Sequence, residues 1–443
     1  MTATPIDSKS PSLLPIAALV ALAVLLPFDL PLLRAPLPAR LGGDLTVTLV
    51  ELAAAAVILA GCARWLLRRT GPEESRRAPF FGAALTWTAL AWVATVFLSA
   101  VWAVGDQGRS DSTRFAARLA LQVGVFLAAG SILGSSRNTP RRALADGLAF
   151  GASIGAMLVL CDLLWPDWAT DGGVRSRWAG TFATANTAAL YFEIVLLVAV
   201  AGAASAAEQR RLDPDRAGRV RWLRNRWAVF DLRLVGVGIL ALGVFATGSR
   251  GAALAVAVLL VGLIWVSGRV ATLRSLRIPA GSAAAVLGAA LSLSALGGNG
   301  LAESAASPSP ASRPAVGALS AWSERPLLGI GPGQLDPDSI PLQLLAEMGL
   351  LGAAVAAVFA MLCLRRMRGG LRHCLTAEAG SRRALWLVGG FGAFALAALH
   401  GCFEGALGHH GVGLALGMSL ALALSAAGDE GQQAGHPQAG PLP

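Results

Sequence analysis

The chain has 443 residues, with 36 basic and 26 acidic side chains and a formal net charge of +10. Hydrophobic residues make up 55% of it and charged residues 14%, whereas a soluble globular protein carries roughly 25% charged residues. This composition excludes a soluble enzyme with a large core. Apolar runs of roughly twenty residues recur along the whole chain, and each is long enough for a bilayer-spanning helix.

These apolar runs predict an all-α integral membrane protein with about twelve transmembrane helices. Lipid offers no partner to a free backbone group, so the runs should be helical. They also lack the apolar–polar alternation of a transmembrane β-barrel. The predicted spans are 13–33, 45–66, 80–104, 115–134, 144–165, 185–206, 234–248, 251–267, 279–297, 343–364, 384–402 and 409–427.

The distribution of arginine supports this assignment. If the N-terminus is cytoplasmic and the spans alternate, 25 arginines fall in cytoplasmic loops and ten on the external side. Such an excess is typical of cytoplasmic loops, so both termini are predicted to be cytoplasmic. The basic charge then sets topology and does not indicate nucleic-acid binding. The external arginines are Arg34, Arg40, Arg109, Arg114, Arg118, Arg175, Arg177, Arg250, Arg313 and Arg325.

The chain is predicted to hold one polytopic membrane domain, residues 1–427. A large external loop, residues 298–342, lies within it between the ninth and tenth spans. This loop begins with the low-complexity stretch Glu303–Pro314 and becomes helix-like through Ala315–Ser323. The polar tail, residues 428–443, is predicted to be disordered. No cysteine or histidine spacing indicates a metal site, so no metal and no cofactor is expected.

Arg250 is the external arginine with the clearest local pattern. It lies in the sequence Thr-Gly-Ser-Arg-Gly, which predicts a tight turn between two spans. The flanking glycines let the backbone approach a ligand, and the following helix N-terminus favours an anion. A guanidinium there suits a phosphate or diphosphate. The alternative is an arginine that extends to lipid headgroups.

Arg177 lies at an external membrane edge, as Arg250 does, and Arg313 lies in the long external loop. Each alone fits a structural or lipid contact. If the three arginines converge, they could hold a diphosphate and stabilise charge as it leaves.

Three carboxylates are candidates for a general base: Asp336, Asp338 and Glu347. Burial could let any of them accept a hydroxyl proton. Asp336 and Asp338 flank a proline, however, and aspartate is common in turns. Asp338 also precedes a helix start and could cap it.

His400 lies near the external end of the eleventh span, with Glu404 one turn later. Ionisable residues within the membrane are candidates for function, although a helix–helix hydrogen bond explains His400 equally well. Glu51 and Asp162 also fall within predicted spans and could mark a proton path.

Five segments together resemble the O-antigen ligase and polymerase superfamily of bacterial membrane glycosyltransferases. The family has a Gly-Thr-Phe-x-x-Pro-Asn segment, a Ser-Arg-Gly turn, a Pro-x-x-Gly-x-Gly segment with a helix after it, and a late His-Gly-x-x-Asp. The similar segments here are, in the same order, Gly180–Asn186, Thr247–Ala252, Glu324–Leu335, Leu342–Gly352 and His400–Glu404.

The resemblance implies a metal-independent inverting glycosyltransferase on the external face of the bacterial inner membrane. Its donor would be a glycan on undecaprenyl diphosphate, and its acceptor lipid A-core in a ligase or the growing glycan in a polymerase. Arg177, Arg250 and Arg313 would bind the diphosphate, with support from Asn186, Ser249, Glu347 and Glu404. The other expected contacts are membrane lipids, and no nucleic acid is expected.

The sequence departs from the family pattern at the position of the proposed base. The family usually has His-Asn shortly before the helix that begins here at Leu342, and the matching residues are Asp338 and Ser339. Asp338 could replace that histidine as the catalytic base, His400 could take over the role, or the chain could be a divergent member with another acceptor. Ala185 also stands where the family has proline, and Glu404 where it has aspartate.

Two alternatives come from other functional classes. A twelve-span secondary transporter should show repeat symmetry, broken helices and charges at mid-membrane. A structural subunit of an envelope polysaccharide assembly is the other alternative.

Overall fold

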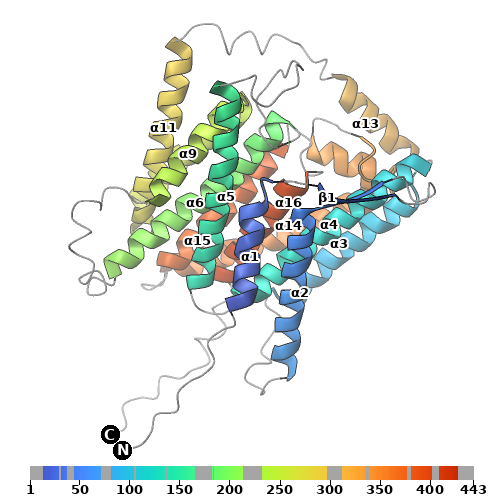
Figure 1. Cartoon of the computed structure of the whole chain (residues 1–443), viewed down its shortest axis with the longest axis horizontal. Coiled ribbons are helices and arrows are strands. Elements are labelled where there is room, and N and C mark those ends of the chain that lie inside the picture. Colours follow the sequence, from blue (N-terminus) through green and yellow to red (C-terminus); the bar gives the residue numbers. More distant parts are fainter. Residues whose placement is uncertain are drawn as a thin grey trace, which may run out of the picture.

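The computed structural model describes most of the chain, and its helices coincide with all twelve predicted spans (Figure 1). They are α1 Leu13–Leu25, α2 Leu49–Thr70, α3 Ala83–Val101, α4 Asp106–Leu133, α5 Asn138–Leu164, α6 Ala185–Leu212, α9 Leu232–Ala246, α10 Arg250–Arg269, α11 Arg277–Leu296, α14 Ile340–Thr376, α15 Ser381–Gly401 and α16 His410–Ala427. The described residues are 13–28, 31–36, 44–70, 81–103, 106–134, 138–164, 182, 184–212, 232–296, 312–335, 339–376, 381–401 and 409–427.

Within these ranges, ten helices are long and apolar enough to cross a membrane, and α1 and α9 are shorter apolar helices. The protein is therefore a multi-pass helical membrane protein. The outer face of α10 shows the pattern expected at a lipid contact. Leu254, Val258, Val261 and Trp265 are each more than 60% exposed, and their spacing places them on one face of the helix.

The first predicted span is too long. Helix α1 ends at Leu25, and the chain then forms a small antiparallel sheet of β1 Pro31–Pro36 and β2 Asp44–Thr48. Pro27 lies two residues after the helix, where its ring cannot continue the backbone hydrogen bonds. Hydropathy alone does not predict this sheet. The helix predicted through Ala315–Ser323 is confirmed, because α13 covers Ser312–Glu324.

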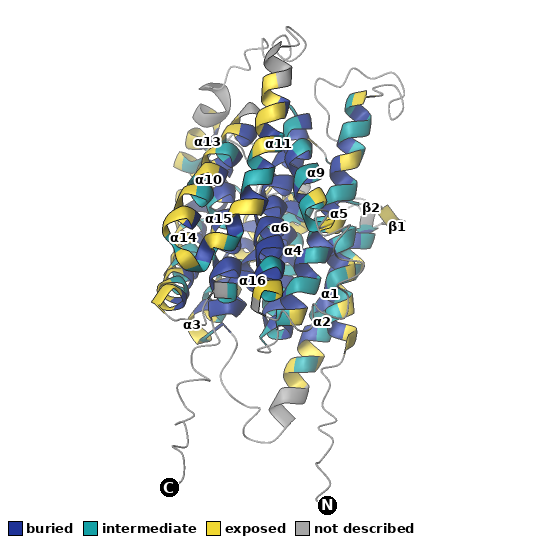
Figure 2. Ribbon diagram, turned by 90° about the vertical axis from the view of Figure 1, so that its left-hand side faces the viewer, coloured by how far each residue is buried: buried dark blue, intermediate teal, exposed yellow. Residues whose placement is uncertain are grey.

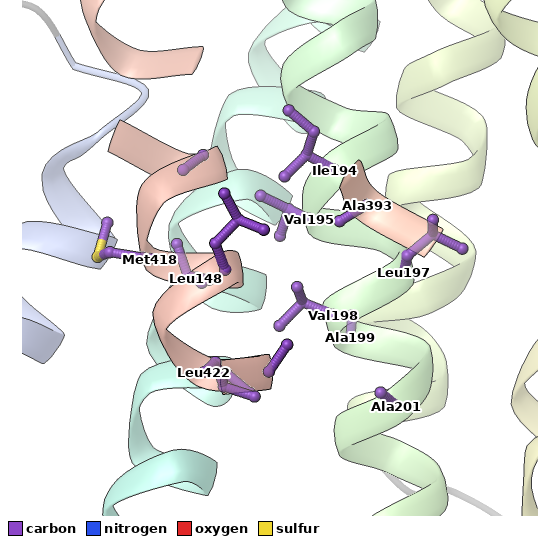
Figure 3. Packing of buried hydrophobic residues seen from close by; sticks show 14 of the residues in the cluster. Leu148, Ile194, Val195, Leu197, Val198, Ala199, Ala201, Ala393, Met418 and Leu422 are labelled. Carbon is purple, nitrogen blue, oxygen red and sulfur yellow. The ribbon is translucent and has the colours of Figure 1, made fainter. Parts of the chain in front are cut away.

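Helix α6 is the centre of the bundle. Its whole membrane-spanning window is buried, and it packs against α15, α9, α5 and α16. Figure 2 shows α6 in the colour of buried residues along the middle of the molecule. Figure 3 shows Ile194, Val195 and Val198 of α6 among side chains of α5, α15 and α16. Small residues permit this close packing: Gly389 of α15 lies directly against Ala201.

Polar contacts join the helices at one end of the bundle. The guanidinium of Arg233, at the start of α9, donates two hydrogen bonds to Asp146 of α5, at 2.8 and 2.7 Å. The buried Arg141 of α5 donates to the hydroxyl and backbone oxygens of Ser425, in the last turn of α16. A cation near a helix C-terminus is favourable. We call the opposite end, which carries α13, the α13 side.

Candidate functional site

Packing contacts gather the predicted functional segments at the α13 side. Gly243, near the end of α9, packs against Phe192 of α6. The next residue of α6, Glu193, is hydrogen bonded to His400 at the end of α15. Gly401, which follows His400, lies against Ile340 at the start of α14. The α9–α10 turn, the first half of α6, the end of α15 and the start of α14 are therefore neighbours.

The Thr-Gly-Ser-Arg sequence forms the predicted tight turn. Helix α9 ends at Ala246, Gly248 has φ +70°, and α10 begins at Arg250. The hydroxyl oxygen of Ser249 accepts a hydrogen bond from the backbone N–H of Ala252, so Ser249 is the N-cap of α10. No described atom lies within 4 Å of a Cβ built on Gly248 or Gly251. Among the described residues, no other side chain therefore packs on these two glycines.

Helix α6 starts in a similar way on the same side. The hydroxyl oxygen of Thr184 accepts a hydrogen bond from the backbone N–H of Thr187 at 3.1 Å. Asn186 is half-buried in the first turn. Two capped helix N-termini therefore face the α13 side, and a helix N-terminus favours anions.

Helix α14 is broken near its start, at Gly349, where φ is +65° and ψ is −171°. A break in a helix frees backbone groups that membrane lipid cannot satisfy. The segment Arg325–Leu335 satisfies them here. The backbone oxygens of Pro326 and Leu327 accept from the N–H groups of Leu350 and Leu351, at 2.8 and 3.2 Å.

The same segment also pairs with the first half of α14. The N–H groups of Ile330 and Gly331 donate to the backbone oxygens of Ala346 and Glu347, both at 3.0 Å. The hydroxyl of Ser99, on α3, contacts the backbone oxygens of Leu328 and Glu347. The Pro-x-x-Gly-x-Gly segment is therefore part of the helix break.

Glycine is required where the segment and α14 touch. A Cβ on Gly329 would lie 2.3 Å from the backbone of Glu347, and a Cβ on Gly349 would lie 2.3 Å from the backbone of Leu327. Gly331 has φ +111°, and its Cβ would lie 2.5 Å from Ala103. These close backbone contacts explain the glycines of the motif.

Glu347 is buried within this arrangement. Its Oε1 accepts a hydrogen bond from the backbone N–H of Leu335 at 2.9 Å. Its Oε2 is buried and has no hydrogen-bond partner among the described residues. A buried carboxyl oxygen without a partner is rare in native proteins. Glu347 therefore places a buried carboxyl group beside the motif.

His400 and Glu193 form a second buried polar group. The Nδ1 atom of His400 lies 3.0 Å from Oε2 of Glu193, and both side chains are almost fully buried. This contact is the helix–helix hydrogen bond expected for His400 as the alternative to catalysis. The two roles are compatible, because a carboxylate that accepts a hydrogen bond from the Nδ1–H group fixes the tautomer in which Nε2 is the proton acceptor.

Several predicted site residues fall outside the described structure. Arg177, Asp338 and Glu404 lie outside the described residues, and the structure describes the backbone alone of Arg250 and Arg313. The convergence of the three arginines therefore stays a prediction, as does the role of Asp338. The described residues contain no group of three or more His, Cys, Asp or Glu side chains that could hold a metal ion.

Glu51 has a structural explanation. Its Oε2 accepts from the backbone N–H of Thr48 at 3.0 Å, and its own N–H donates to the Thr48 hydroxyl at 3.3 Å. These reciprocal bonds form a capping box at the start of α2. Glu51 also pairs with Arg118 at 3.3 Å. These contacts place Glu51 at the start of α2.

Sequence comparisons do not add a family assignment. No protein-family model matches the chain, and no curated protein matches it either.

Proposed function

We propose that the protein is a membrane glycosyltransferase that moves a glycan from undecaprenyl diphosphate to an acceptor hydroxyl. The observation that carries this proposal is the gathering of separate motif segments at the α13 side. The α9–α10 turn, the start of α6, the segment before α14 and the end of α15 are distant in sequence and neighbours in space. Segments scattered over both ends of the bundle would have argued against a common site.

The proposed reaction is a substitution at the anomeric carbon. The acceptor hydroxyl oxygen bonds to that carbon, the bond to the diphosphate oxygen breaks, and the hydroxyl proton goes to a base. Arg250, with Arg177 and Arg313, stabilises the departing diphosphate. Asp338 is the proposed base, by its position in the motif. Glu347 and His400 are the described alternatives, since each belongs to a buried polar contact at the same side.

The arginine distribution supports an external location for the site. The opposite end carries most of the arginine-rich segments, which is typical of the cytoplasmic face. The α13 side would then lie on the periplasmic face of the bacterial inner membrane. There the acceptor would be lipid A-core in a ligase or the growing glycan in a polymerase.

Arg250→Ala tests the proposed diphosphate site. In cells that lack the native gene, this variant should abolish glycan transfer on a polysaccharide gel while its abundance on an immunoblot stays normal. Arg269→Ala is the matched control, because Arg269 lies in the last turn of the same helix, at the opposite end of the bundle. Normal transfer by Arg250→Ala would remove Arg250 from the mechanism.

Gene deletion separates the two members of the superfamily. Loss of long chains with one repeat retained indicates a polymerase. Loss of all attached glycan, with lipid-linked chains accumulating, indicates a ligase. Unchanged envelope polysaccharide would refute both.

A secondary transporter is the second candidate, and two observations favour it. Helix α14 is broken at Gly349, and the Glu193–His400 pair is buried among membrane-spanning helices. Both features occur in transporters. Substrate uptake by reconstituted vesicles without glycan transfer would establish this alternative. Glycan transfer in vesicles that take up no substrate would exclude it.

A further inference from the structure

A cavity of about 220 Å³ lies among the membrane-spanning helices, next to the candidate site. Side chains of α3, α4, α6, α14, α15 and α16 line it, and nearly all of them are apolar. Ile340 and Ala398 are among the lining residues. Ile340 also contacts Gly401, which follows His400, so one part of the cavity is adjacent to the Glu193–His400 pair.

The cavity also contains buried hydrogen-bonding groups. Gln343 of α14 is 6% exposed and lines the cavity, and its Oε1 has no hydrogen-bond partner among the described residues. The indole N–H of Trp92, on α3, is likewise buried without a hydrogen bond in the described structure. Gln122 of α4 is a further lining amide, 9% exposed. Buried polar groups normally have partners, so the Oε1 atom of Gln343 and the indole N–H of Trp92 point to a ligand.

We infer that this cavity binds one hydrocarbon chain of a membrane lipid, with a polar group of that lipid hydrogen bonded to Gln343. An apolar wall attracts a hydrocarbon chain and not water. A glycan carries many hydroxyl groups, and a nearly all-apolar lining offers them too few hydrogen-bond partners. The acceptor Oε1 of Gln343 suits a lipid hydroxyl or amide N–H, and the Trp92 N–H suits a carbonyl oxygen.

Two substitutions on α14 distinguish the cavity from the outer surface of the bundle. Ala360 lines the cavity, and Ala360→Phe would place an aromatic ring where the lipid's hydrocarbon chain is proposed to bind. Val358 is on the same helix and 43% exposed, so Val358→Phe adds the same ring to the outer face. The full chain is purified in mild detergent, and the lipid retained per protein is measured by native mass spectrometry.

The inference predicts a difference between these variants. Ala360→Phe should lower lipid retention about tenfold, which corresponds to ~1.4 kcal/mol, and Val358→Phe should leave it unchanged. Gln343→Leu keeps the approximate size and removes the hydrogen bond, so it should lower retention about fivefold. Equal retention by the Ala360→Phe and Val358→Phe proteins would overturn the inference.

Photolabelling tests the wild-type protein and identifies which kind of lipid supplies the bound hydrocarbon chain. The probes are a phosphatidylethanolamine and a polyprenyl phosphate, each with a diazirine in its chain. Adducts on cavity residues such as Phe359 or Leu416 support the inference, and the probe that labels them more strongly identifies the lipid. Adducts restricted to outward residues such as Val358, from both probes, would refute it. No readout here depends on glycan transfer, so failure of the proposed function leaves the result interpretable.

Discussion

The helix break in α14 lets us predict how far Gly349→Ala lowers the free energy of unfolding. The backbone at Gly349 has φ +65° and ψ −171°, a region that is essentially restricted to glycine and costs other residues about 1–3 kcal/mol. The added Cβ would also lie 2.3 Å from the backbone of Leu327, and overpacking of this kind costs about 1–3 kcal/mol. Alanine recovers about 0.4–1 kcal/mol by restricting the unfolded chain. We expect a net loss of about 1–6 kcal/mol in the free energy of unfolding.

Gly369→Ala is the matched control for this prediction. Gly369 lies in the same helix, is exposed, and has no described atom within 4 Å of an added Cβ. Alanine is favoured over glycine in a helix interior by about 0.5–1 kcal/mol, so this variant should be slightly more stable than the wild type. The assay is unfolding of the purified protein by dodecyl sulfate titrated into detergent micelles, followed by tryptophan fluorescence. If Gly349→Ala unfolds at the same dodecyl sulfate fraction as Gly369→Ala, the inference that the helix break requires glycine at position 349 is wrong.

Two further predictions concern contacts at the α13 side. Glu193→Ala and His400→Ala should each destabilise the protein by about 3–5 kcal/mol, because each leaves a buried polar partner behind. The double variant should lose less than the sum of the two, and additive losses in the same unfolding assay would contradict the contact. Ser249→Ala removes the N-cap of α10 and should cost about 1 kcal/mol. Ser292→Ala, at an exposed position of α11, is its control, and equal stability of the two would refute the cap.

The positions of the membrane helices could be predicted from the sequence because every span is apolar and most are long. The boundary at α1 was harder to predict, since the residues from Leu26 to Leu33 are apolar except for Asp29, while the helix ends before Pro27. The β1–β2 sheet depends on pairing between segments, which hydropathy does not report. Glu51 could have been recognised from the Thr-x-x-Glu pattern of a capping box.

The candidate site was less predictable because its partners are distant in sequence. The rule that singles out Glu51 and Asp162 applies equally to Glu193, which lies inside the most buried helix. Only the fold identifies His400 as its partner, 207 residues away. In the same way, one glycine in a long apolar helix gives little signal of a break. The break becomes visible once the segment Arg325–Leu335 is seen to satisfy its backbone groups.

The shortness of α1 and α9 has a consequence for the surrounding membrane. With a rise of 1.5 Å per residue, helices of 13 and 15 residues span about 20 and 22 Å, whereas the hydrocarbon core of a bilayer is about 30 Å thick. Both helices pack against α5, so the mismatch falls on one sector of the bundle. A short hydrophobic stretch is accommodated by local thinning of the bilayer. The bilayer would thus be thinner beside the described parts of α1 and α9 than beside the longer helices.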